Sequence, residues 1–147
     1  MKRMTIVFVL LSLLLAACGG GTVAEVEELT VMVDGAEEAT YRVSDLEEMP
    51  EAQAEFQDTT YVGVPLMALL EAVGVDPAQV SAVKAVAADG YSMSYQPELF
   101  TREDVLVAYG TAQGALAADD GTFRMVLPGE EGKLNVRMLA ELEVTTP

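Results

Sequence analysis

Residues 61–74 read YVGVPLMALLEAVG and join a short apolar run to an amphipathic segment. Pro65 suits the first position of a helix, because the N–H that it lacks has no partner there. Gly74 suits the left-handed residue that commonly ends a helix. Between them, apolar side chains recur at the spacing of one helical face, at Leu66, Leu69, Leu70 and Val73. The stretch therefore predicts a helix over 65–73 that packs one face against a core.

Short strand patterns surround this helix. Residues 28–33 and 40–43 predict two strands that Asp34-Gly35 joins as a hairpin. Asp89-Gly90 predicts a second hairpin between residues 80–88 and 91–95. Further strands are expected at 105–109, 122–127 and 142–145, a loop at 112–118, and either a strand or a helix at 135–139. Because short helices interrupt many short strands, we expect one sheet-rich α+β domain.

The composition excludes several classes of function. The chain has 147 residues, with 8 basic and 24 acidic side chains and a net charge of −16. Such a chain repels phosphate backbones, so we expect no nucleic-acid partner. It has no His and one Cys, which excludes Ser-His-Asp and Cys-His catalysis, His-ligated metals and an internal disulfide. The glutamates at positions 25, 27, 28, 37, 38, 47, 48 and 51 are interpreted as solvated faces. Asp119-Asp120-Gly121 lacks the ligand pattern of a calcium loop and predicts a turn, so no metal site is predicted.

The N-terminus has the pattern of an export signal. Lys2 and Arg3 precede an apolar run over 6–17, which is shorter than the roughly 20 residues that span a membrane. The sequence Leu15-Ala16-Ala17-Cys18-Gly19 resembles the bacterial lipobox, in which the cysteine becomes lipidated. We therefore predict a lipoprotein signal peptide at 1–17, a lipidated Cys18 with a Gly-rich tether at 18–26, and a domain at 27–147. An ordinary signal peptide followed by an incidental Cys is the alternative.

Lipidation predicts where the protein is found. Two acyl chains, palmitate among them, anchor a protein stably, so membrane lipid is the expected partner through Cys18. The protein would be exported and held on the outer face of the cell membrane or in the cell envelope, where a membrane or envelope protein is a second expected partner. Removal of the leader takes away Lys2 and Arg3 and no acid, which changes the net charge from −16 to −18.

Against this acidic background the few cations indicate a binding site. Arg124, Lys133 and Arg137 lie within fourteen positions around Pro128-Gly129. Guanidinium groups bind planar anions through paired hydrogen bonds, so the cluster predicts an anionic or pterin-like ligand. Tyr91 would add an aromatic face. Alternatively, each cation pairs with a surface carboxylate, which contributes about 0–1 kcal/mol, and Tyr91 only packs.

Six short segments carry a family resemblance. They are residues 44–50 (SDLEEMP), 61–75 (YVGVPL, then LL and GV), 88–92 (ADGYS), 105–109 (VLVAY), 123–129 (FRMVLPG) and 136–144 (VRMLAELEV). In this order they resemble the sulfite-oxidase-type molybdopterin-binding domain. The resemblance covers about residues 43–144. It implies a sheet-rich α+β fold with a pocket that holds the molybdenum cofactor in full-length enzymes, and it places Arg124 and Arg137 near that pocket.

The chain also departs from this family. The enzymes bind molybdenum through a cysteine near the segment that corresponds to 61–66, and residues 56–61 contain none. Asn135 stands where the family often has Trp or Ser, and Arg137 stands where it has Lys. A metal without a thiolate is poorly held. Three hypotheses follow: a non-catalytic module that binds a pterin-like or other small ligand, a structural or protein-interaction lipoprotein with a closed pocket, and a molybdenum-dependent oxidoreductase with unusual ligands.

Overall fold

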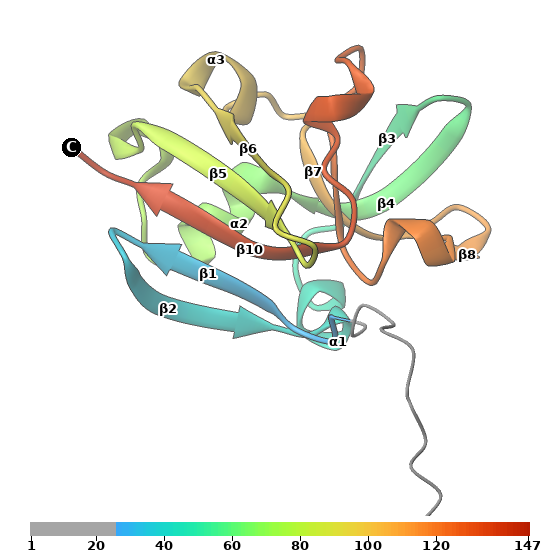
Figure 1. The fold of residues 1–147 in the computed structure, drawn as a ribbon, viewed down its shortest axis with the longest axis horizontal. Helices are drawn as coiled ribbons and strands as arrows, with labels where there is room; N and C mark the ends of the chain where they lie inside the picture. Colours follow the sequence, from blue (N-terminus) through green and yellow to red (C-terminus); the bar gives the residue numbers. More distant parts are fainter. Residues whose placement is uncertain (1–25) are drawn as a thin grey trace, which may run out of the picture.

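Two sheets form the scaffold of the protein. The computed structural model describes residues 26–147, so the predicted signal peptide, Cys18 and nearly all of the tether lie outside the described residues. Sheet A has the order β2 (Ala36–Tyr41), β1 (Leu29–Val33), β10 (Leu139–Thr145), β5 (Ala82–Ala87) and β6 (Ser92–Tyr95). Sheet B has the order β3 (Ala52–Phe56), β4 (Thr59–Pro65), β7 (Leu106–Thr111) and β8 (Gly114–Ala115), and β9 (Arg124–Val126) also pairs with β7. Sheet A occupies the left of Figure 1 and sheet B the right.

Strand pairing ties the two ends of the domain together. β1 pairs with β10 in parallel, with Val31 opposite Leu142, whereas the other pairs are antiparallel. Both predicted hairpins are present, as β1–β2 and β5–β6. The expected loop at 112–118 contains the short strand β8, so that expectation was incomplete.

The helices are short and fill the spaces around the sheets. α2 (Leu66–Ala72) confirms the predicted helix, with Pro65 as its N-cap and Gly74 at φ +81°. The other helices are α1 (Val43–Glu47) and α3 (Pro97–Phe100), with 3₁₀ turns at η1 (Pro77–Gln79), η2 (Ala118–Asp120) and η3 (Gly132–Leu134). Within residues 26–147, no helix has the length and apolar character to cross a membrane.

The core has two parts because side chains alternate across each strand of sheet B. Val107 and Met125 point toward sheet A and join the main core with α2 and α3. Their neighbours Leu106 and Val126 point to the opposite face and form a small second core with Ala54, Tyr61 and Ala108. Tyr61 of this second core also lines one of the two hollows described below.

Gly63 allows β4 and β7 to pack closely. The pairing of these strands shifts register between Val62 and Gly63. A Cβ atom at this position would collide with the backbone oxygen of Val107. The glycine is therefore required by the close approach of two backbones.

Candidate functional site

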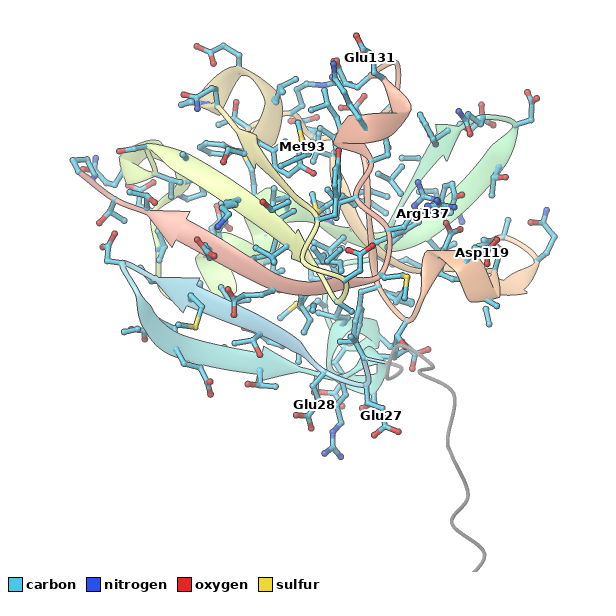
Figure 2. The ribbon with its side chains drawn as sticks, viewed as in Figure 1. Glu27, Glu28, Met93, Asp119, Glu131 and Arg137 are labelled. Carbon is cyan, nitrogen blue, oxygen red and sulfur yellow. The ribbon has the colours of Figure 1, made fainter. Side chains whose placement is uncertain are left out.

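Two hollows share a wall formed by Gly132, Asn135 and Arg137, which lie between β9 and β10. The first hollow has a volume of about 280 Å³ and the second about 430 Å³. Other polar and aromatic residues of the first hollow are Asp89, Tyr91, Asp119 and Lys133. The second hollow is completed by Phe56, Gln57, Tyr61, Asp120 and Arg124. The structure thus gathers the four ligand-binding residues predicted from the sequence around two adjoining hollows, on the side of Figure 2 where Arg137 and Asp119 are labelled.

Arg124 is a buried residue whose guanidinium is already paired. It extends from β9 on the face of the second core and is 4% exposed. Its Nη1 donates to Oδ1 of Asp120 over 2.6 Å and to the hydroxyl of Tyr61 over 2.8 Å. Its carbon Cζ lies 4.5 Å from the ring centre of Tyr61 and 5.7 Å from that of Phe56. Arg124 therefore lines the second hollow chiefly as an internal brace.

Tyr61 connects the two charges of this buried pair. Its hydroxyl accepts from Arg124 and donates to Oδ2 of Asp120 over 3.4 Å. Burial raises the pKa of Tyr61. The charge of Arg124 lowers this pKa, and the charge of Asp120 raises it. The hydroxyl therefore keeps its proton at neutral pH and serves both neighbours at once.

Arg137 has the opposite environment. Residues 26–147 contain six cations, and five of them form ion pairs: Arg42 with Glu28, Lys84 with Glu143, Arg102 with Asp104 and Glu130, Arg124 with Asp120, and Lys133 with Glu131. Within this part of the chain, Arg137 is exposed and has no ion-pair partner. Arg137 also lines both hollows, so it places an uncompensated cation beside each of them.

The backbone around Arg137 is held by neighbouring elements. The N–H of Met125 donates to the carbonyl of Val136, and the N–H of Leu139 donates to that of Phe123, both over 2.8 Å. Met138 has a left-handed φ of +52°, and its N–H donates to the carbonyl of Asp120. Residues 135–138 are therefore neither the strand nor the helix expected from the sequence, but an irregular segment attached to β9 and η2.

Lys133 and Tyr91 line the first hollow and not the second. The Nζ of Lys133 lies 2.7 Å from Glu131, and both side chains are exposed. Tyr91 is 44% exposed and donates its hydroxyl to the backbone oxygen of Lys133 over 2.8 Å. Lys133 is thus a paired surface cation, whereas Tyr91 is a partly exposed aromatic residue in the same hollow.

Several residues line the two hollows without having been predicted as site residues, among them Phe56, Tyr61, Asp120 and Asn135. Asp120 was interpreted only as part of the Asp119-Asp120-Gly121 turn. The available signal was a carboxylate four positions before Arg124, although this spacing indicates a contact mainly within helices. Asn135 was noted only as a departure from the family pattern.

The comparisons place this geometry in a family. The model of the oxidoreductase molybdopterin binding domain matches residues 22–147. The chain belongs to this family. The predicted resemblance and sheet-rich α+β fold are therefore confirmed. A search of curated proteins finds no relative with significant similarity.

Solved structures of the same fold include the sulfane dehydrogenase SoxCD from Paracoccus pantotrophus. It has 23% sequence identity and a TM-score of 0.67, and the alignment covers 80% of this chain. The chain matches only 38% of the length of the SoxCD chain. At this identity the likeness shows a shared fold.

The donor set of the hollows does not fit the molybdenum of the family's cofactor. The chain has no His, and its single Cys, Cys18, lies outside the described residues. The two hollows offer the carboxylates of Asp89, Asp119 and Asp120, and no thiolate or imidazole. Molybdenum in a thiolate-poor site would be weakly held and poorly tuned. The chemistry present instead suits an organic anion: one free guanidinium, aromatic surface and carboxylate acceptors.

Proposed function

We propose that this protein is a membrane-anchored, non-catalytic binding domain for a small planar anion of the pterin kind. Arg137 carries the proposal, because it is the cation without an ion-pair partner in residues 26–147 and lines both hollows. In a chain with a net charge of −16, an unpaired guanidinium supplies the local positive charge that an anion needs. Its planar fork suits a carboxylate or phosphate through two hydrogen bonds.

The rest of the first hollow favours a pterin-like ring over a simple inorganic anion. A pterin has an exocyclic amino group and a ring N–H, both of which are donors. Asp89 and Asp119 provide acceptors in the same hollow, and Tyr91 provides an aromatic surface. An inorganic anion would meet these two carboxylates as repulsive charges, whereas a ring with donors can hydrogen-bond to them.

Fluorescence titration of the purified full-length protein with pterin-6-carboxylate tests this proposal. We expect saturable binding that Arg137→Ala weakens about 10-fold or more, because a hydrogen bond to a charged group contributes about 1.5–3 kcal/mol. Arg42→Ala is the matched control, since it removes the same charge from an exposed ion pair with Glu28. Equal loss in the two variants, or no binding at millimolar concentration, would contradict the proposal.

The non-catalytic part of the proposal rests on the donor set. Metal analysis of protein purified from its native membrane decides between this function and a molybdenum-dependent oxidoreductase. We expect much less than one molybdenum per chain. A ratio of about one per chain, retained through purification, would show that the metal is held despite the missing thiolate and imidazole.

The membrane anchor is proposed from the lipobox at Cys18. Because Cys18 is the sole cysteine, Cys18→Ala removes the one thiol that can carry a lipid. We expect an alkyne-labelled fatty acid to mark the unmodified protein in the cell envelope and to leave the variant unmarked. Continued labelling of the variant would contradict the assignment.

A structural or protein-interaction lipoprotein is the second candidate. The observation in its favour is that Arg124, Tyr61 and Asp120, which line the second hollow, already bond to one another. In that case pterin binding would be absent, and crosslinking in intact cells would join the protein to one envelope partner in constant ratio.

A further inference from the structure

The loop over residues 128–135, here called the site loop, carries part of the wall shared by the two hollows. It contains η3 and no strand. Its own backbone hydrogen bonds are local turns, from Glu130 to Leu127, from Leu134 to Glu131 and from Asn135 to Gly132. A loop with only such bonds is expected to sample several conformations, so other contacts must fix its shape.

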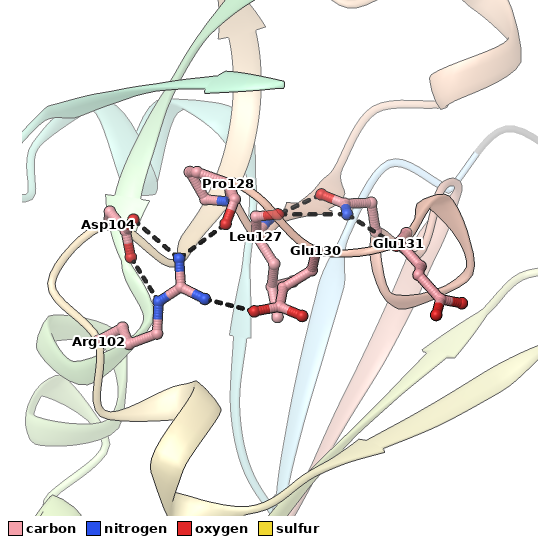
Figure 3. A network of polar contacts seen from close by, with 7 residues as sticks. Arg102, Asp104, Leu127, Pro128, Glu130 and Glu131 are labelled. Carbon is pink, nitrogen blue, oxygen red and sulfur yellow. Dashed lines mark hydrogen bonds and ion pairs between the residues drawn. The ribbon is translucent and has the colours of Figure 1, made fainter. Parts of the chain in front are cut away.

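Side chains from outside and within the loop provide those contacts, and most of them bond to backbone carbonyls. Arg102, which follows α3, donates Nη2 to the carbonyl of Pro128 over 2.7 Å and Nη1 to Glu130 over 2.8 Å. Asp104 accepts two further bonds from this guanidinium, both at 2.9 Å, and so fixes its plane (Figure 3). The hydrogen bond from Arg102 lowers the pKa of Asp104, which keeps this carboxylate charged.

Asn135 holds the loop from within the protein. Its side chain accepts from the N–H of Leu127 over 2.7 Å and donates to the carbonyls of Leu127 and Glu131 over 3.4 and 3.2 Å. Asn135 is 2% exposed, so these bonds are shielded from water. They tie the end of the site loop to its beginning, two positions before Arg137.

Two tyrosines near β6 complete the set. Tyr95 donates its hydroxyl to the carbonyl of Leu134 over 2.7 Å, and Tyr91 donates to that of Lys133. Tyr95 is fully buried, and burial raises its pKa, so it remains a donor. Carbonyls at positions 127, 128, 131, 133 and 134 are therefore all bonded to side chains.

We propose that Arg102, Tyr95 and Asn135 are positioning residues that hold the site loop in one conformation before a ligand arrives. The purpose of this arrangement rests on the proposed function: a loop that is already ordered loses less conformational entropy on binding and presents Arg137 at a fixed place. Arg102 and Tyr95 line neither hollow, so they act on a ligand only through the site loop.

Hydrogen exchange of the full-length protein tests the proposal in Arg102→Gln and Tyr95→Phe, with Arg42→Gln as the charge-matched control. We expect amides of residues 129–137 to exchange at least about 10-fold faster in both test variants, with β5 and β10 unchanged. A general loss of structure would speed exchange in those strands as well. Unchanged exchange of the loop in both test variants would overturn the proposal.

Affinity for two ligands separates positioning from charge recognition. We expect both test variants to bind pterin-6-carboxylate and the uncharged 6-methylpterin about 3- to 10-fold more weakly. Arg137→Ala, in contrast, should weaken only the charged ligand. Faster loop exchange with unchanged affinity for both pterins would also overturn the proposal. If the unmodified protein bound neither pterin, the proposed function would fail, and loop exchange alone would decide whether these residues hold the loop.

Discussion

Arg124 and Arg137 line the same hollow, yet they lie in opposite environments. Arg124 is buried, paired with Asp120 and covered by two aromatic rings. Arg137 is exposed and has no ion-pair partner among residues 26–147. The charge of one arginine is thus compensated inside the protein, and the charge of the other is left without an ion-pair partner in this part of the chain. The difference teaches that a cation near a pocket indicates binding only when its charge is not already compensated.

The largest expected effect on stability comes from breaking the buried ion pair of Arg124 and Asp120. Arg124→Ala leaves the 8% exposed Asp120 without its cation, and breaking a buried pair in this way costs about 3–5 kcal/mol. Urea denaturation at pH 7 measures this as a lower free energy of unfolding. Arg137→Ala should change the same quantity by less than about 0.5 kcal/mol.

A double replacement tests whether the loss of stability comes from an isolated buried charge. Arg124→Met with Asp120→Leu removes both charges, so no isolated buried charge remains, and we expect most of the lost stability to return. A double variant as unstable as Arg124→Ala would show that the pair contributes through something other than charge compensation. Equal stability of the Arg124→Ala and Arg137→Ala variants would remove the contrast altogether.

A smaller effect on stability is expected at Tyr61, whose hydroxyl bonds to both Arg124 and Asp120. Tyr61→Phe removes one acceptor for Arg124 and one donor to Asp120 while keeping the ring that faces the guanidinium. Because the direct ion pair remains, the free energy of unfolding should fall by about 1 kcal/mol. A loss of stability as large as that of Arg124→Ala would show that the hydroxyl of Tyr61, and not the ion pair, makes the larger contribution to stability.

The smallest effect is expected at Glu141 on β10, where a charge is only partly compensated. Partial burial and then the nearby Glu143 raise the pKa of Glu141, while Lys84 opposes the rise. The folded state therefore favours the protonated form of Glu141. The stability that this preference contributes is complete at pH values below the pKa of Glu141 in the unfolded chain. It is lost as the pH rises through the pKa of Glu141 in the folded state. Glu141→Gln should raise Tm slightly at pH 7 and leave it unchanged near pH 3.

The exposed Glu55 on β3 provides the control for this measurement, since Glu55→Gln also removes one acidic charge. A Tm gain of equal size in the two variants would indicate relief of the overall negative charge. A gain confined to Glu141→Gln would identify the local environment on β10 as the cause.

Local patterns were sufficient to predict most of the fold. The leucine spacing that begins at Leu66 predicted α2, and Asp89-Gly90 predicted the β5–β6 hairpin. Both signals lie within one element or one turn. The segment before β10 was ambiguous because its shape depends on bonds to β9 and on the left-handed Met138, which no local pattern encodes.

The sequence indicated which cations to look at, but not the environment of each one. The scarcity of cations identified Arg124 and Arg137 together. Their difference comes from contacts over long distances in the sequence, since Tyr61 lies 63 positions before the arginine that it contacts. Local spacing carries no information about such pairs. The contacts that Tyr91, Tyr95 and Arg102 make with the site loop could not be predicted from the sequence for the same reason.

The most direct test of the central claim is the charge preference of the site, measured as the ratio of dissociation constants for 6-methylpterin and pterin-6-carboxylate. We predict that the unmodified protein favours the carboxylate-bearing pterin about 10-fold or more. This preference should persist in Arg42→Ala and disappear in Arg137→Ala. A preference that survives the loss of Arg137, or its absence from the unmodified protein, would contradict the account.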